Sequence, residues 1–164
     1  MPRILFAIIL LFMPAAVLGS TIKSVMPDAE LRGVATFRYL GFPLYEARLF
    51  TNDADALDWR EDFGIELRYL RNLTRQDLVE GTMRELSRTG APSQVRAQLN
   101  QCFADVDKGD RFLAVSRGED QVSFWLNGSR TCTLRYPDIK TRFMAIFVGD
   151  NTRSRNFTRK LKGE

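Results

Sequence analysis

Alternation of apolar and polar residues over short, turn-bounded segments constrains the fold of this chain more than any other feature. In the segment 63–73, every second residue up to Tyr69 is apolar, whereas Glu66 and Arg68 fall on the opposite face. This period of two is typical of a half-buried strand. Asn127-Gly128 separates two further strand-like segments and is the dipeptide most typical of a two-residue β-hairpin. Because strands joined by tight turns pair antiparallel, the sequence predicts an antiparallel sheet.

The order of strand and helix signals predicts the fold class. We expect strands at 31–39, 44–50, 63–73, 111–116, 122–126 and 130–136. A helix is expected to begin at Thr74, whose hydroxyl can cap it together with Asp77, and further helices are expected at 92–103, 137–149 and 153–161. Three strands, two helices, three strands and two helices predict an α+β fold with the helices on one face of the sheet.

An apolar leader predicts that the protein is exported. Arg3 precedes an unbroken apolar run at 4–13, and Val17-Leu18-Gly19 is a small-x-small cleavage site before Ser20. This pattern is typical of a secretory signal peptide. The run is shorter than the ~20 apolar residues of a membrane-spanning helix, although a membrane anchor is the alternative. We therefore interpret 1–19 as a signal peptide and 20–164 as one periplasmic or secreted domain, without stable membrane insertion after cleavage.

The composition excludes several classes of active site. The chain has no histidine, which removes the usual general base and the commonest nitrogen ligand of metals. We therefore expect no metal and no other cofactor. The net charge of +4 and a basic C-terminus could indicate nucleic-acid binding. Because the protein is predicted to be exported, we instead interpret the basic residues as the solvated face of a helix; they are Arg153, Arg155, Arg159, Lys160 and Lys162.

The two cysteines, Cys102 and Cys132, are candidates for a disulfide. Helical spacing places Cys102 on the same face as Leu99, and strand alternation places Cys132 on the same face as Leu134. Both thiols are therefore expected to point into one core, which is a necessary condition for a bridge. An even number of cysteines in an exported chain favours a disulfide, and a pair of buried free thiols is the alternative.

Five segments together carry a resemblance to a known family. They are Gly33…Phe37-Arg38 followed by LYEARL at 44–49, the alternating strand 65–69 with Arg71 after it, Asp107-Lys108-Gly109-Asp110, Phe124…Asn127-Gly128, and Phe147-Val148-Gly149-Asp150 before a short basic helix. In this order and spacing, residues 31–163 resemble the bacterial chalcone isomerase-like proteins. The resemblance implies an open-faced β-sandwich, with helices packed on one face of an antiparallel sheet. It also implies two functions, because plant relatives are isomerases and other relatives are non-enzymatic fatty-acid binders.

The catalytic residues of the plant isomerases match this chain poorly. Arg38 is the nearest match to their strand arginine, and Tyr69 matches their tyrosine only loosely. Their threonine falls close to Pro43, which has no hydroxyl. The cyclisation needs stabilisation of a developing enolate, which Arg38 could supply, and a positioned water, for which we identify no residue. An isomerase, or intramolecular lyase, acting on a small aromatic or enone substrate is therefore the alternative function. A ligand-free interaction module is the third.

The resemblance implies a ligand between the sheet and the helices, with an arginine at its polar end. Candidate residues are Arg38, Tyr45, Tyr69 and Arg71. A guanidinium offers a planar pair of donors that fits a carboxylate, and an apolar pocket with a few polar groups is the usual form of a ligand site. We therefore expect a fatty acid or similar apolar ligand with an acidic head. Strict alternation places Arg38 on the opposite face from Tyr39, unless a bulge near Gly41 turns it inward.

Overall fold

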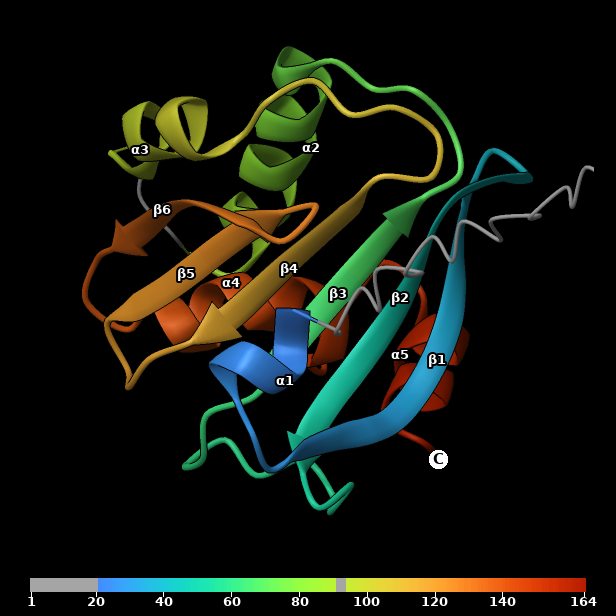
Figure 1. The fold of residues 1–164 in the computed structure, drawn as a ribbon. Coiled ribbons are helices and arrows are strands. Elements are labelled where there is room, and N and C mark those ends of the chain that lie inside the picture. Colours follow the sequence, from blue (N-terminus) through green and yellow to red (C-terminus); the bar gives the residue numbers. More distant parts are fainter. Residues whose placement is uncertain (1–20, 91–93) are drawn as a thin grey trace, which may run out of the picture.

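The computed structural model describes residues 21–90 and 94–164 (Figure 1), so the predicted signal peptide lies outside the described residues. The strands are β1 (Ala29–Tyr39), β2 (Phe42–Asn52), β3 (Gly64–Tyr69), β4 (Arg111–Ser116), β5 (Gln121–Leu126) and β6 (Ser129–Arg135). The helices are α1 (Thr21–Val25), α2 (Arg75–Arg88), α3 (Val95–Cys102), α4 (Ile139–Val148) and α5 (Arg155–Leu161).

The six strands form one antiparallel sheet in chain order, β1-β2-β3-β4-β5-β6. The predicted α+β class and the antiparallel sheet are therefore confirmed. Asn127 and Gly128 connect β5 to β6 with φ of 48° and 86°, as expected for the predicted two-residue turn. β3 is shorter than the predicted strand 63–73, because the chain turns away after Tyr69 and only Leu73 pairs again, in a single bridge to Val106.

Four helices cover one face of the sheet and enclose the main core. Figure 1 shows α2 to α5 on the same side of the sheet. Their apolar residues belong to one continuous cluster with inward residues of all six strands. The capping box predicted at the start of α2 is present, since the Thr74 hydroxyl accepts from the Asp77 N–H at 3.1 Å and the Asp77 carboxylate accepts from the Thr74 N–H at 3.0 Å. The sequence-based expectation of helices on one face therefore holds for α2 to α5.

A fifth helix lies on the opposite face of the sheet and was not predicted. Ile22 and Met26, in and just after α1, pack in a separate small cluster with Phe50, Leu113 and Val115. Leu113 alternates with the main-core residues on β4, so it faces the other side of the sheet. The short length of α1 explains why its apolar pattern gives no clear helical period in the sequence.

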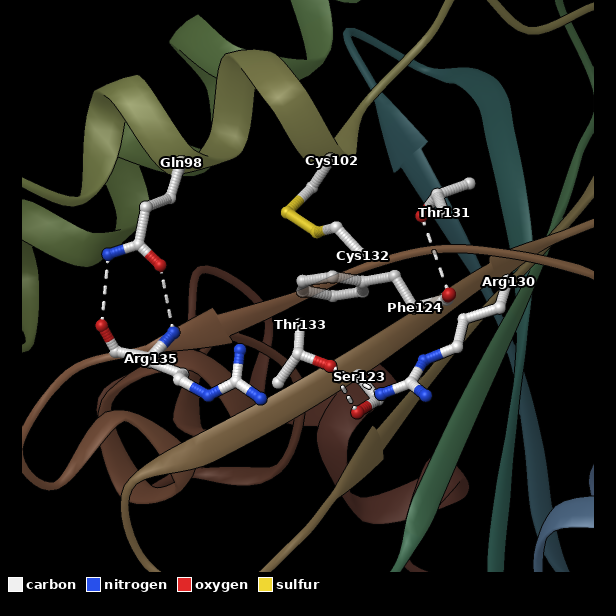
Figure 2. Close-up of a disulfide and its surroundings, with 9 residues drawn as sticks. All are labelled: Gln98, Cys102, Ser123, Phe124, Arg130, Thr131, Cys132, Thr133 and Arg135. Atoms are coloured by element: carbon white, nitrogen blue, oxygen red, sulfur yellow. Dashed lines mark hydrogen bonds between the residues drawn. A yellow bond between two sulfur atoms is a disulfide. The ribbon is translucent and has the colours of Figure 1, made fainter.

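Cys102 of α3 and Cys132 of β6 form a disulfide with a Cα–Cα distance of 5.1 Å (Figure 2). The same helix and strand are joined by the Gln98 side chain. Its amide donates to the Arg135 carbonyl and accepts from the Arg135 N–H, both at 2.9 Å. Gln98 therefore pairs with the outer edge of β6 as a neighbouring strand would, and the disulfide fixes α3 beside it.

Removal of the disulfide should lower stability without changing the fold. For the double variant Cys102→Ala/Cys132→Ala, we expect a loss of about 3–4 kcal/mol in the free energy of unfolding, because the bridge closes a loop of about 30 residues. Urea denaturation would measure this loss. Reductant should destabilise the wild type by a similar amount and leave the double variant unchanged; equal stability of all samples would contradict a structural role.

The last helix packs directly on the backbone of β1 at Gly33. A Cβ at Gly33 would overlap the carbonyl oxygen of Leu161 and lie 2.7 Å from that of Lys160. Beside it, the Arg32 guanidinium donates to the Lys162 carbonyl at 3.0 Å. The close contact between α5 and β1 thus requires a residue without a side chain, which accounts for the glycine in the first of the five segments that carry the family resemblance.

Gly33→Ala should destabilise the protein by about 1–3 kcal/mol, because the added methyl group forces α5 away from β1. Gly81→Ala is a matched control in α2, where an added Cβ meets no atom within 4 Å. It should be neutral or stabilise by up to about 1 kcal/mol through helix propensity. Chemical denaturation would measure the stability of both variants. Equal stability of Gly33→Ala and Gly81→Ala would contradict the packing argument.

Candidate functional site

A cleft of about 520 Å³ opens between the sheet and the helices at the end where β2 begins and β3 ends. β2 and β3 contribute its floor, α2 forms one wall, and the end of α4 together with Arg153 closes another side. This volume lies within the usual range for small-molecule sites. The cleft is therefore the strongest candidate for a ligand site in the described part of the chain.

Tyr45 and Tyr69 form the centre of the floor. They are direct cross-strand neighbours on β2 and β3, with ring centroids 6.4 Å apart and planes 79° from parallel. Both side chains are buried, and burial raises the pKa of each phenol well above its ordinary value. Both phenols therefore remain protonated at neutral pH. Within residues 21–90 and 94–164 neither hydroxyl makes a hydrogen bond, so each keeps a donor for a ligand.

The cleft continues inward as an apolar cavity of about 40 Å³. Leu67, Tyr69, Leu78 and Phe147 are among the residues that line both spaces. The inner walls are mostly aromatic and come from β4, α4 and the segment after α3; the residues are Phe103, Phe112 and Phe143. At its present size the inner cavity has room for no more than a few water molecules. It is the apolar end of a site whose outer end is polar.

Arg71 lies at the rim of the cleft, just after the end of β3. Its guanidinium is 5.6 Å from the centre of the Phe42 ring, a cation–π contact. Among the described residues it has no ion-pair partner, and neither does Arg84, which lines the cleft from α2. The rim therefore presents two guanidinium groups that a ligand anion can reach.

The structure separates Arg38 from the other three predicted site residues. A register shift falls between Phe37 and Arg38, near the predicted position of a bulge. Arg38 nevertheless stays exposed, donates to the Gly41 carbonyl at 3.2 Å and lines a different groove, between β1 and α5. Tyr39 lines the cleft instead. Strict alternation along β1 therefore outweighs the local irregularity.

An ion pair between a buried carboxylate and a partly exposed guanidinium lies in the cleft wall and was not expected from the sequence. Glu85 of α2 has a side chain only 5% exposed, and its Oε1 lies 2.9 Å from Arg153 Nε, although without the geometry of a hydrogen bond. Arg88 approaches the other carboxylate oxygen at 3.6 Å. The Arg153 guanidinium also lies 4.7 Å from the centre of the Phe37 ring. The cleft therefore contains a fixed negative charge that is neutralised from inside the protein.

The interpretation of Arg153 as part of a solvated helix face is therefore wrong. Arg153 precedes α5 rather than lying on it, and its partly exposed side chain reaches the buried Glu85 of α2. Glu85 follows Leu78 by seven residues and so lies on the same face of α2, a spacing that could have revealed it. No comparable signal in the sequence marks Arg153, because its partners come from distant segments.

No group of three or more acidic or cysteine side chains in segments 21–90 and 94–164 is arranged to hold a metal ion. In the same segments, no helix is long and apolar enough to cross a membrane.

Comparisons with known proteins identify the fold. No family model matches the sequence, and no curated protein matches it. Among solved structures, the fold is similar to that of AtFAP1, a fatty-acid binding protein from Arabidopsis thaliana, with a TM-score of 0.65 and 10% sequence identity over 83% of this chain and 87% of that chain. At this identity the likeness shows the fold alone. The chain has a chalcone isomerase-like fold, as the sequence resemblance implied.

Proposed function

We propose that this protein is a non-enzymatic carrier that binds an apolar ligand with an acidic head, such as a fatty acid, in the cleft between the sheet and α2. One observation supports this most directly. The cleft combines an apolar inner end with the Arg71 guanidinium at its rim, which has no ion-pair partner within residues 21–90 and 94–164. This distribution of polarity matches a molecule with an apolar tail and a single carboxylate.

In this proposal the head and the tail occupy opposite ends of the cleft. The carboxylate accepts hydrogen bonds from Arg71 at the rim, and the tail passes over Leu67 towards the inner cavity. Leu78 and Phe147 line both spaces, so rotation of these two side chains would join the spaces and admit a longer tail. Arg153 and Arg88 already pair with Glu85 in the wall, so the proposal places the head group at the rim, where Arg71 lies.

The isomerase alternative has less support. The cyclisation needs an arginine near the developing negative charge and a positioned water. Arg38, the nearest sequence match to the arginine of the plant enzymes, lies outside the cleft, and Pro43 has no hydroxyl to hold a water. The ligand-free alternative is disfavoured by a cleft of about 520 Å³.

We also propose that residues 1–19 are removed during export and that the protein acts in the periplasm or outside the cell. The leader pattern supports this location. The Cys102–Cys132 disulfide is consistent with it, because structural disulfides persist mainly in oxidising compartments.

Arg71→Ala should weaken the binding of a fatty acid such as palmitate at least about tenfold, because it removes a charge-assisted hydrogen bond to the carboxylate. Fluorescence displacement or calorimetry would measure the dissociation constant. Arg68→Ala is the matched control, since Arg68 lies on the outward face of β3, makes no ion pair within the described residues and is exposed. Equal affinity of the two variants would remove Arg71 from the site.

Gly81→Phe tests the cleft itself. Gly81 lines the cleft from α2, and a Cβ there points into open space. A phenyl group at this position should fill the cleft and abolish binding, while helix propensity keeps α2 folded. Gly81→Ala should retain the ligand. Native mass spectrometry of protein purified without added lipid would report occupancy, and retention of the same ligand by Gly81→Phe would place the ligand elsewhere.

The export proposal predicts a defined N-terminus. Protein recovered from the periplasm or the medium should begin at Ser20, with both cysteines oxidised. Intact-mass analysis before and after alkylation would establish both points. Recovery of the full chain in the membrane fraction would instead support the anchor interpretation of residues 1–19.

A further inference from the structure

We propose that the tip of the β1–β2 hairpin, residues 38–43 (the hairpin tip), docks on the surface of a membrane that contains anionic lipids. The hairpin tip protrudes from the sheet (Figure 1). Tyr39 pairs with Phe42 and Arg38 with Pro43, whereas the pairing of β2 with β3 begins only at Tyr45. The last residues of the hairpin are therefore a two-stranded ribbon without a third strand beside it.

The hairpin tip carries most of the exposed large apolar side chains of the described residues. Leu40 is 80% exposed, Phe42 63% and Tyr39 48%. A single exposed apolar side chain is common, but three side by side on a projecting turn are not. Leucine and aromatic side chains are those that enter the interface between lipid head groups and acyl chains.

The backbone at the hairpin tip gives a second reason to regard the apolar residues as functional. Leu40 and Gly41 have φ of 50° and 83°, the left-handed conformations of a tight hairpin turn. Asparagine or glycine adopts this conformation with little strain, whereas leucine does so at a cost. At Leu40 the chain therefore has an apolar side chain where both solubility and local geometry favour a polar one.

Positive charge accompanies the apolar side chains. The Arg38 guanidinium donates to the Gly41 carbonyl in the turn, and the Arg71 guanidinium lies over the Phe42 ring. Residues 38–43 include no acid. An apolar projection with cations beside it fits the head groups of anionic lipids, to which each cation adds electrostatic attraction. The hairpin tip is convex and small, so it offers too little area for a stable protein interface.

The hairpin tip is also next to the mouth of the cleft, because Tyr39 and Arg71 line the cleft from its rim. Docking would therefore bring that mouth to the membrane surface, where an amphiphilic ligand could enter or leave without crossing water. This transfer role rests on the proposed function, whereas membrane docking itself does not require a ligand.

Co-sedimentation with phosphatidylcholine vesicles, with and without phosphatidylglycerol, would test the docking on the protein as isolated after export. The wild type should bind the anionic vesicles preferentially and lose binding as salt is raised. The double variant Leu40→Asn/Phe42→Thr should bind at least about tenfold less. It should remain folded, since Asn-Gly suits this turn and threonine suits a strand.

Two further variants make the test specific. Leu31→Thr/Val34→Thr removes the other two exposed large apolar residues of β1, away from the hairpin tip, and should bind vesicles as the wild type does. Arg38→Gln should weaken binding to anionic vesicles while leaving the affinity for a fatty acid in solution unchanged, because Arg38 lies outside the cleft.

Three outcomes would overturn the docking proposal: equal binding to both kinds of vesicle, full binding by the Leu40→Asn/Phe42→Thr variant, or a dimer in solution that this variant converts to a monomer. Fatty-acid affinity is measured separately, without vesicles. If the protein binds a fatty acid but its vesicle binding does not depend on the hairpin tip, only the docking proposal is rejected. If vesicle binding depends on the hairpin tip but no fatty acid binds, only the carrier proposal is rejected.

Discussion

Burial of one face of the antiparallel sheet under α2 to α5 is the constraint on which the rest of the structure depends. Each strand contributes inward side chains to a single apolar cluster, and the helices supply the other half of it. Two local contacts hold this cover in place at opposite edges of the sheet. Cys102 ties α3 to β6, and the absence of a side chain at Gly33 lets α5 lie against β1.

The cleft exists because this cover is incomplete at one end of the sheet. There the floor contains two tyrosines beside Leu44 and Leu67, and the wall contains the buried Glu85. Removing a carboxylate from water is costly unless it is paired, and Arg153 and Arg88 meet that requirement. A core built for stability alone has no need of these groups, whereas a binding site needs polar groups within an apolar surface.

Several parts of the site could be predicted from the sequence because they depend on local periodicity. Alternation places Tyr45 and Tyr69 on the inward faces of their strands, and the structure makes them cross-strand neighbours. The same rule points Arg38 away from the core, as found. Arg153 could not be predicted in this way. Its position depends on a turn after α4 and on a partner nearly seventy residues earlier in the chain, and no local pattern encodes either.

The sequence by itself determined the fold class, the order of strands and helices along the chain, and the inward face of the strands at 63–69 and 130–136, because side-chain periodicity and turn chemistry act over a few residues. It also placed both cysteines towards one core. Only the tertiary structure decided that Glu85 meets Arg153, that α1 covers part of the second face, and that the end of the β1–β2 hairpin projects beside the cleft. These features depend on how segments that are far apart in the sequence are positioned relative to one another. The packing of the whole core fixes those positions.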